Sequence, residues 1–397
     1  MLNDSPINYF KGTHRIIAPD ETIRKFEDKL KIAGVTRVTD ITDLDRINIP
    51  VFSAIRPTAE DGSVSVYAGK GINKSHAKAS AIMEAYERYS AERQDIDIIF
   101  KENLENTINP NSLNLEKNID LNENIELEWT KTKDIISDEE FLIPSNAIYH
   151  PYTPKNKEFQ LFKSNTNGLA SGNNLEEAIL HGIFEVIERD AWSIFELTKK
   201  NKKEINKSTI TSHLVNDLLD KFNSESIDIK ILDITADLDI PTVAAISDDT
   251  LLKDPALLTI GVGTHLNPEI AILRALTEVA QSRATQIHGA REDTVRADFM
   301  RKAGYKRMKK INKHYFEKED KLINFQKLKN KSKSSIKEDI LRCIKEVKKV
   351  NIDNIFFTEL TRKEIGVPVV RVVIPELELY AIDSSRIGKR FLDLVWK

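Results

Sequence analysis

Acidic and basic side chains recur at helical spacing in three separate stretches of this chain. The three sets are Glu84, Glu87 and Arg88; Glu177, Glu185, Glu188 and Arg189; and Arg274 and Glu278. Residues three or four positions apart share one face of a helix, so each stretch can direct its polar groups to one point. Several such faces together hold Mg²⁺ through oxygen ligands and leave positions for phosphates. The pattern predicts a metal–nucleotide site built from side chains.

The usual phosphate-binding loops are absent from the sequence. It contains neither G-x-x-x-x-G-K-[ST] nor G-x-G-x-x-G, and the fragments GKG at 69–71 and GVG at 261–263 are too short to replace them. The loop SNTNGLASGNN at 164–174 directly precedes the second acidic stretch. Its small residues can expose backbone N–H groups, and the following helix N-terminus adds to the field. This loop is a candidate phosphate cradle.

Each acidic stretch also has a purely structural interpretation. The first could be a solvated helix face with a Glu84–Arg88 pair worth about 0.2–0.5 kcal/mol. With Asn174 as N-cap, Glu177 stands at the capping-box position, where its carboxylate returns to the N–H of the cap. An Arg274–Glu278 surface pair contributes little and has the less favourable order.

Two other residue types attract attention but predict no chemistry. His181 has no second His at ligand spacing, so packing is the favoured interpretation. The single cysteine, Cys343, excludes internal disulfides and multi-cysteine metal sites, and its Lys-rich surroundings offer it no base. We interpret it as structural.

Composition restricts the class of protein. The chain has 397 residues, of which 40% are hydrophobic and 30% charged, with a net charge of −3. This length exceeds one ordinary core, so two lobes or one large elaborated domain are expected. The charge predicts no general attraction to nucleic acid. No signal peptide opens the sequence and no run approaches the roughly 20 apolar residues that span a bilayer, so we expect a cytoplasmic protein and no membrane contact.

Helical and strand-like patterns alternate along the chain. Helices are expected at 21–33 and 76–93, after Asn174, and after Asn267 with Pro268 as first helical residue. Strand signals fall at 51–57, 228–234, 241–246, 257–262 and 367–374. Residues 100–125 form a polar excursion, and 291–349 form a Lys-rich, mostly helical region. The mixture predicts an α/β (α+β) fold with sizeable mixed sheets and packed helices.

Five segments together resemble the YcaO-domain family, whose members bind ATP and Mg²⁺ and activate backbone amides. They are GKGINKSHAKASAIMEAYER, SNTNGLASGNNLEEAILHGIFEVIERD, DLDIPTVAAISDD, GVGTHLNPEIAILRALTEVAQSR and VPVVRVVIPELE, in family order. The resemblance covers roughly residues 10–390 and implies a YcaO-type ATP-binding fold. It also implies an N-terminal segment, 1–60, that contributes to the nucleotide site, and a catalytic domain at 61–397.

The resemblance assigns roles by position. The implied ATP-binding set is Arg15, Thr22, Glu84, Glu87, Arg88, Glu177, Glu185, Glu188, Arg189, Arg274 and Glu278. Within it, the implied metal ligands are Glu84, Glu87, Glu185, Glu188 and Glu278, and the implied catalytic residues are Glu188, Arg189 and Arg274. Arg15 stands where other members have Lys. No catalytic base is assigned; the candidates for accepting the substrate proton are the phosphate itself and a residue near the C-terminus such as Lys397.

Family chemistry implies that a peptide amide oxygen attacks the γ-phosphate of ATP while a nucleophile adds to the amide carbon. A neighbouring Cys, Ser or Thr of the peptide gives an azoline, and external sulfide gives a thioamide. Azoline-forming members commonly end in P-x-P-x-P, whereas this chain ends FLDLVWK. We therefore expect a thioamidation enzyme like the methanogen members that modify a glycine of methyl-coenzyme M reductase. The resemblance implies a homodimer and a TfuA-like partner.

Two alternatives stay open. One is an azoline-forming cyclodehydratase or an accessory protein with the same ATP site. The other is a nonenzymatic protein whose Lys-rich residues 301–333 bind RNA or an acidic partner. Acidic residues are interspersed there, so a solvated helical surface is the simpler interpretation.

Overall fold

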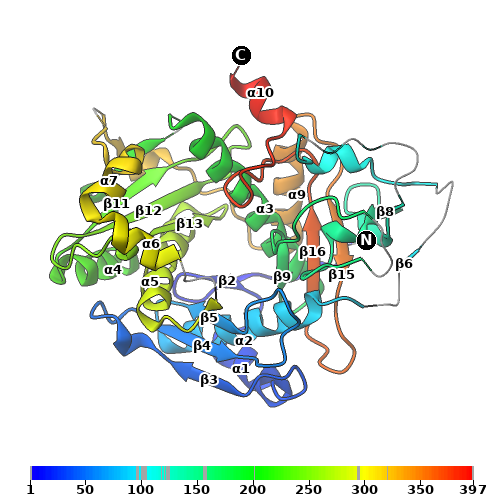
Figure 1. The fold of residues 1–397 in the computed structure, drawn as a ribbon, viewed down its shortest axis with the longest axis horizontal. Coiled ribbons are helices and arrows are strands. Elements are labelled where there is room, and N and C mark those ends of the chain that lie inside the picture. Colours follow the sequence, from blue (N-terminus) through cyan, green and yellow to red (C-terminus); the bar gives the residue numbers. More distant parts are fainter. Residues whose placement is uncertain are drawn as a thin grey trace.

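Helices pack on sheets throughout the chain, as Figure 1 shows for this computed structural model. The structure describes residues 2–94, 98–99, 105–117, 119, 121, 126–154, 159–200, 202–292, 296–319 and 321–395. Within these ranges the strands form a six-stranded, a five-stranded and a three-stranded sheet, and a short two-stranded ribbon. The predicted α/β (α+β) class is confirmed.

The five-stranded sheet has the order β13-β12-β11-β10-β14. Its strands are β10 (Lys203–Asn206), β11 (Ile227–Asp233), β12 (Thr242–Asp249), β13 (Ile260–Thr264) and β14 (Ile323–Asn324). Neighbours are antiparallel except β10 and β14, which are parallel. Every residue of β12 is buried because helix α5 (Pro268–His288) covers β12 and β13, while α4 (His213–Ser224) packs on β11.

The six-stranded sheet has the order β6-β7-β15-β16-β9, with β8 paired to β7. Its strands are β6 (Ile98–Ile99), β7 (Trp129–Asp134), β8 (Glu140–Pro144), β9 (Leu169–Ser171), β15 (Phe356–Glu359) and β16 (Val369–Val373). Helix α3 (Leu175–Thr198) packs on β16 and β9, and α9 (Ile336–Lys348) packs on α3. The apolar side of α3 is buried between them.

The three-stranded sheet lies at the bottom of Figure 1 and orders β3 (Arg37–Asp40), β4 (Val51–Ile55) and β5 (Val66–Lys70). Helix α2 (Lys74–Ala91) covers β4 and β5, and α1 (Pro19–Phe26) packs on α2. The ribbon pairs β1 (Asn8–Tyr9) with β2 (His14–Arg15). Strands β3 and β4 belong to the first 60 residues, and β4 pairs with β5 at residues 66–70. The N-terminal segment and the start of the following region therefore share one sheet.

Some element boundaries differ from the predicted ones. The first helix ends at Phe26 and continues only as a 3-10 turn, Glu27–Lys29. Strand β13 begins at Ile260 because the 3-10 turn Pro255–Leu257 occupies the preceding residues. Of the excursion at 100–125, the structure describes 105–117, 119 and 121, including the 3-10 turn Pro110–Leu113; the other positions lie outside the described residues.

The Lys-rich region contains α6 (Arg296–Ala303), α7 (Tyr305–Ile311) and α8 (Lys313–Phe316), followed by β14 and α9. Several of its basic side chains form ion pairs: Arg301 with Asp254, Lys309 with Asp248, and Lys331 with Asp239. A last helix, α10 (Lys389–Val395), packs on α3. These ion pairs favour a folded surface over an open array of basic groups.

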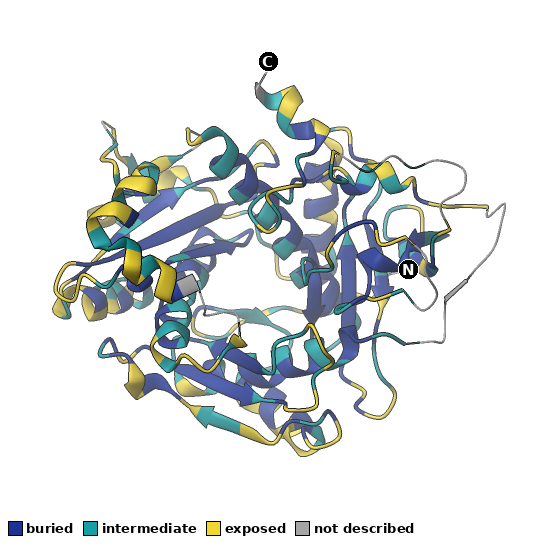
Figure 2. Cartoon of the chain, viewed as in Figure 1, coloured by how far each residue is buried: buried dark blue, intermediate teal, exposed yellow. Residues whose placement is uncertain are grey.

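Figure 2 shows that buried residues fill the sheets and the helix faces against them, while exposed residues lie on the outer helix faces and loops. Cys343 is fully buried in α9, and burial raises the pKa of its thiol well above the ordinary value. This agrees with a structural role. Across the described residues, no helix combines the length and the apolar character needed to cross a bilayer.

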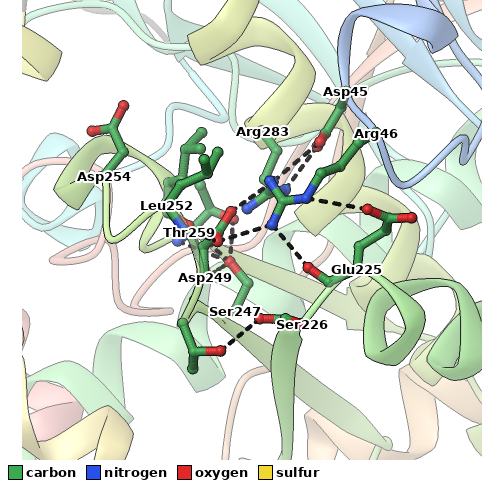
Figure 3. A network of polar contacts seen from close by, with 12 residues as sticks. Asp45, Arg46, Glu225, Ser226, Ser247, Asp249, Leu252, Asp254, Thr259 and Arg283 are labelled. Carbon is green, nitrogen blue, oxygen red and sulfur yellow. Dashed lines mark hydrogen bonds and ion pairs between the residues drawn. The ribbon is translucent and has the colours of Figure 1, made fainter.

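A buried charge network joins the N-terminal region to the five-stranded sheet (Figure 3). Arg283 of α5 is fully buried; its Nε donates to Asp45 Oδ2 at 2.7 Å and its Nη2 to Asp249 Oδ2 at 3.2 Å. Arg46 Nη2 donates to the other oxygen of Asp249 at 2.9 Å. The network therefore fixes the turn at Thr42–Leu44 against α5 and the end of β12.

Candidate active site

A cavity of about 560 Å³ lies where α2, α3 and α5 meet the N-terminal segment. Each of the three helices packs on a different sheet: α2 on the three-stranded, α3 on the six-stranded and α5 on the five-stranded sheet. The structure brings every side chain of the implied ATP-binding set to the wall of this one cavity. They are Arg15, Thr22, Glu84, Glu87, Arg88, Glu177, Glu185, Glu188, Arg189, Arg274 and Glu278.

Helix α2 presents its acidic face to the cavity because its small residues bury against β5. Asn73 caps the helix by accepting a bond from the N–H of His76 at 2.9 Å. Arg88 Nη2 donates to Glu84 Oε1 at 3.1 Å, so the predicted helix pair forms, but on the cavity wall. Glu87 accepts bonds from the N–H and hydroxyl of Ser171 at 2.9 and 2.8 Å, and burial raises its pKa to about 7.

Helix α3 begins as predicted, with Asn174 accepting a bond from the N–H of Glu177 at 2.8 Å. The structural alternative for Glu177, a reciprocal bond from its carboxylate to the N–H of the cap, is not what the structure shows. The Glu177 carboxylate instead accepts bonds from the N–H of Asn173 at 3.2 Å and of Ile16 at 3.0 Å. It also lies 3.8 Å from Arg15 Nε. Glu177 therefore fastens the N-terminal segment to the start of α3 at the edge of the cavity.

Farther along α3, Glu188 is 2% exposed and accepts a bond from the N–H of Thr264 at 3.0 Å. Arg274 Nη2 lies 3.9 Å from the same carboxylate oxygen. Burial raises the pKa of Glu188 to about 7, against the opposing effect of Arg189 and Arg274. Burial likewise raises the pKa of Glu185. These two carboxyl groups are poised for a cationic ligand, which would favour their charged forms.

Helix α5 begins as predicted, with Asn267 accepting a bond from the N–H of Glu269 at 3.0 Å. No Arg274–Glu278 ion pair forms among the described side chains. Glu278 pairs instead with Lys70 of β5, and Arg274 faces Glu188. Burial favours the neutral form of Glu278, but Lys70 and Arg189 outweigh it and lower the pKa of this carboxyl.

The donor set of the cavity fits a magnesium–triphosphate. Four guanidinium groups on its wall each leave one buried nitrogen without a partner: Arg15 Nη1, Arg88 Nε, Arg189 Nε and Arg274 Nε. Unpartnered buried donors are costly, and phosphate oxygens satisfy them. Within the described parts of the chain, no three acidic, His or Cys side chains stand close enough to hold a metal ion by themselves. Phosphate oxygens would therefore have to complete the shell of an ion placed among the glutamates.

The cavity wall also includes Lys70, His76 and Gln286, which the sequence analysis did not select. Asn173 of the candidate phosphate cradle and Gln281, on the helix face of Arg274 and Glu278, line it as well. Lys70 was noted only as part of a short glycine fragment. The glycines on either side of Lys70 were the sequence signal that could have identified it. Gly69 and Gly71 lie directly against α2, so Lys70 between them lies next to this helix. Asn173 accepts a bond from the hydroxyl of Thr22 at 2.9 Å.

His181 lines the cavity and packs edge-on against Phe184, with ring centroids 6.4 Å apart. Burial holds its pKa well below the ordinary value, so the ring is neutral. This packing agrees with the interpretation from sequence. The suggested base Lys397 lies outside the described residues.

This chain resembles known proteins over most of its length. A family model described as YcaO cyclodehydratase, ATP- and Mg²⁺-binding, matches residues 68–378. An uncharacterised protein of Methanothermobacter thermautotrophicus is 52% identical over 376 residues, covering 94% of this chain and 97% of its own. An uncharacterised protein in the tfuA 3′ region of Rhizobium leguminosarum bv. trifolii is 29% identical, covering 92% and 89%.

Among solved structures, YcaO from Methanopyrus kandleri bound with AMPPCP and Mg²⁺ superposes with a TM-score of 0.81 at 26% identity, covering 97% of this chain and 98% of that one. The chain belongs to the YcaO family. Its YcaO domain binds ATP and Mg²⁺, and the family consists of ATP-dependent enzymes that modify peptides by activating backbone amides.

Proposed function

We propose that this chain is a peptide thioamidation enzyme that uses ATP and Mg²⁺ to activate a backbone amide for attack by sulfide. The main support for ATP-dependent activation is that Glu188, Arg189 and Arg274 line the same cavity, together with further acidic and basic side chains. The choice of sulfide is supported by the methanogen relative and by the relative encoded near tfuA. A glycine of methyl-coenzyme M reductase is the substrate suggested by the family resemblance.

In the proposed reaction the amide oxygen attacks the γ-phosphorus of ATP, and ADP leaves. Hydrosulfide adds to the amide carbon through sulfur, and the C–O bond to the phosphorylated oxygen then breaks. The products are a thioamide, ADP and phosphate, and the proton of hydrosulfide leaves with the phosphate. Bound Mg²⁺ supplies Lewis-acid neutralisation of the phosphates.

The residues of the chain have distinct parts in this scheme. Arg189 and Arg274 direct positive charge into the cavity and would stabilise charge on the transferred phosphoryl group. Glu188 orients Arg274 and is also proposed as a metal ligand, with Glu84, Glu87, Glu185 and Glu278. Arg15 and Thr22 would hold the nucleotide from the N-terminal side, with Arg88 and Glu177. This supports the proposal that residues 1–60 contribute to the nucleotide site and 61–397 form the catalytic domain.

The direct test is incubation of the full chain with a glycine-containing peptide of the reductase, ATP, Mg²⁺ and sulfide, with a TfuA-like protein added in a parallel arm. Mass spectrometry should show a gain of about 16 Da as sulfur replaces oxygen. A sulfide-independent loss of about 18 Da from a Cys- or Ser-containing peptide would instead identify an azoline-forming cyclodehydratase, the function named by the family model. The homodimer is proposed from the same resemblance, and sedimentation tests it.

A matched pair of variants separates catalysis from folding. Glu188→Gln keeps an acceptor for the N–H of Thr264 but cannot ionise, so ATP turnover should fall by roughly 100-fold or more while the fold survives. Glu317→Gln removes an exposed carboxylate of α8's C-cap and should leave turnover unchanged. Equal turnover in both variants would contradict the proposed role of Glu188.

A further inference from the structure

A second, smaller cavity is lined in part by Asn165 and Asn167, on either side of Thr166 in the sequence. Its volume is about 50 Å³, and its walls include Arg371 of β16, Arg386, Asn165, Asn167 and Val186. Among the described residues, the one carboxylate residue on its wall, Glu376, is exposed to solvent. A single water needs roughly 10–15 Å³ on this measure, so the space holds more than one water or a small ion.

Both arginines are deeply buried, at 4% exposed for Arg371 and 2% for Arg386. Each is bonded to backbone carbonyls. Arg371 donates from Nε to Ala147 O at 3.0 Å and from Nη2 to Asn165 O at 2.7 Å. Arg386 donates from Nε to the carbonyl of residue 114 at 2.8 Å and from Nη2 to that of residue 113 at 2.5 Å. Neither has a carboxylate within ion-pair distance in the described parts of the chain.

The remaining nitrogen of each guanidinium, Nη1, is buried and has no partner. Burial lowers the pKa of Arg371 to about 9, with the positive charges of Arg88 and Arg386 adding to the effect and Glu185 opposing it. Burial likewise lowers the pKa of Arg386 to about 10, although Asp383 and Glu116 oppose it. The aromatic face of Phe162, 3.8 Å from the Arg386 guanidinium, offsets only part of this cost. Two buried cations whose nearest carboxylates act only from beyond ion-pair distance are an expensive arrangement, and one anion in contact with both would relieve it.

We propose that this Arg371–Arg386 cavity binds a small inorganic anion between the two unpartnered Nη1 groups. The anion can be a halide or hydrosulfide. Hydrosulfide is the one that the proposed thioamidation requires, and this assignment rests on that proposed function. Asn167 Oδ1 is also buried, unpartnered and on the cavity wall. Hydrosulfide has a hydrogen to donate to it, whereas a halide has none.

The small cavity adjoins the candidate active site. Consecutive residues divide between the two: Thr166 lines the candidate active site, while Asn165 and Asn167 line the small cavity. In α3, Glu185 lines the candidate active site and the next residue, Val186, lines the small cavity. Residues 165–167 therefore border both the anion cavity and the candidate active site.

Crystals of the full chain soaked in bromide test the anion site without any substitution. An anomalous peak within contact of Arg371 Nη1 and Arg386 Nη1 is expected. Data with bromide bound elsewhere and none at this cavity would overturn the proposal.

Thermal unfolding in solution gives the matched comparison. At constant ionic strength set with gluconate, replacing gluconate by bromide or, anaerobically, by hydrosulfide should raise the Tm of the native chain by on the order of 1–2 °C. Arg371→Met should lose this shift. Arg362→Met should keep it, because Arg362 also donates to two carbonyls, those of Tyr89 and Glu92, but lies away from the cavity.

If Arg371→Met does not fold, Leu379→Trp fills the cavity from a half-buried wall position and should abolish the shift with both arginines intact. A shift that survives Leu379→Trp overturns the proposal. Bromide binding without hydrosulfide binding supports the anion site and overturns its assignment to sulfide. If the protein forms a thioamide but binds no anion here, the proposed function stands and the anion site is wrong. If it binds the anion but forms no thioamide, the anion site stands and the proposed function is wrong.

Discussion

Glu188 shows how one side chain can combine a structural bond with a ligand-facing position. Its carboxylate is nearly enclosed, accepts the N–H of Thr264 and faces Arg274 from one wall of the cavity. Burial raises its pKa to about 7, and the same cause raises the pKa of Glu87 to about 7. Carboxyl groups with such values change charge near neutrality, where bound cations decide their state.

The raised pKa of Glu188 predicts a pH-dependent stability. Between pH 4.5, the ordinary value, and about 7, the folded protein binds a proton at Glu188 that the unfolded chain has released. The free energy of unfolding in the absence of ligand should therefore fall as pH rises through this window, with Glu87 acting in the same direction. Glu188→Gln should make the fall shallower, as measured by urea unfolding at several pH values from 5 to 8.

Glu364→Gln is the matched control for this measurement. Hydrogen bonds lower the pKa of the exposed Glu364 carboxyl, so its contribution to stability is present above pH 4.5 and is lost only at lower pH. Glu364 is not among the charges that shift the pKa of Glu188, so its removal should leave the slope between pH 5 and 8 unchanged. A slope that Glu188→Gln does not alter would mean that this carboxyl is ionised in the folded protein across the window.

At the scale of elements, glycines set how closely each helix of the cavity approaches its sheet. A Cβ on Gly69 of β5 would lie 2.1 Å from the backbone N of Ala81 in α2. On Gly263 of β13 it would lie 2.2 Å from the carbonyl O of Ala271 and 2.7 Å from the Cβ of Arg274 in α5. The fragments GKG and GVG, too short to bind phosphate as loops, thus position the helices that carry the charged groups.

Gly263→Ala should destabilise the protein by roughly 1–3 kcal/mol, because α5 must move off β13 to admit the methyl group. The same shift displaces Arg274, so ATP affinity should fall in the protein that remains folded. Urea unfolding and ATP titration measure the two effects. Gly289→Asn is the control, since nothing lies within 4 Å of that position and Asn tolerates its φ of +65°. An unchanged ATP affinity in Gly263→Ala would show that α5 does not set the position of Arg274.

At the scale of the whole molecule, the cavity exists because three sheets meet. Its walls come from helices that each belong to a different sheet, so no single layer contains the site. The buried network of Arg283, Asp45 and Asp249 ties the turn before β4 to α5 and β12 (Figure 3). It joins residues more than 200 positions apart in the sequence.

Arg283→Met should cost about 3–5 kcal/mol, because two buried carboxylates then lose their shared counter-charge. Chemical unfolding measures the loss. Arg301→Met removes a more exposed pair with Asp254 and should cost less than about 1 kcal/mol. Similar losses in the two variants would contradict the role of the network in joining the sheets.

What the sequence determined by itself was local. The caps Asn174 and Asn267, the start at Pro268 and the shared faces of Glu84 with Arg88 follow from helix geometry over three or four residues. The family motifs likewise indicated ATP, Mg²⁺ and the fold class, and the comparisons confirm these.

Only the tertiary structure decided which partners the charged groups take. Glu278 binds Lys70 rather than Arg274, and Glu177 binds Ile16 and Asn173 rather than its own cap, because these choices depend on distant segments that packing brings together. The raised pKa values and the buried Arg371 and Arg386 also depend on desolvation by the surrounding sheets. Periodicity along one chain determines which face a residue occupies, whereas burial and charge partners are properties of the assembled core.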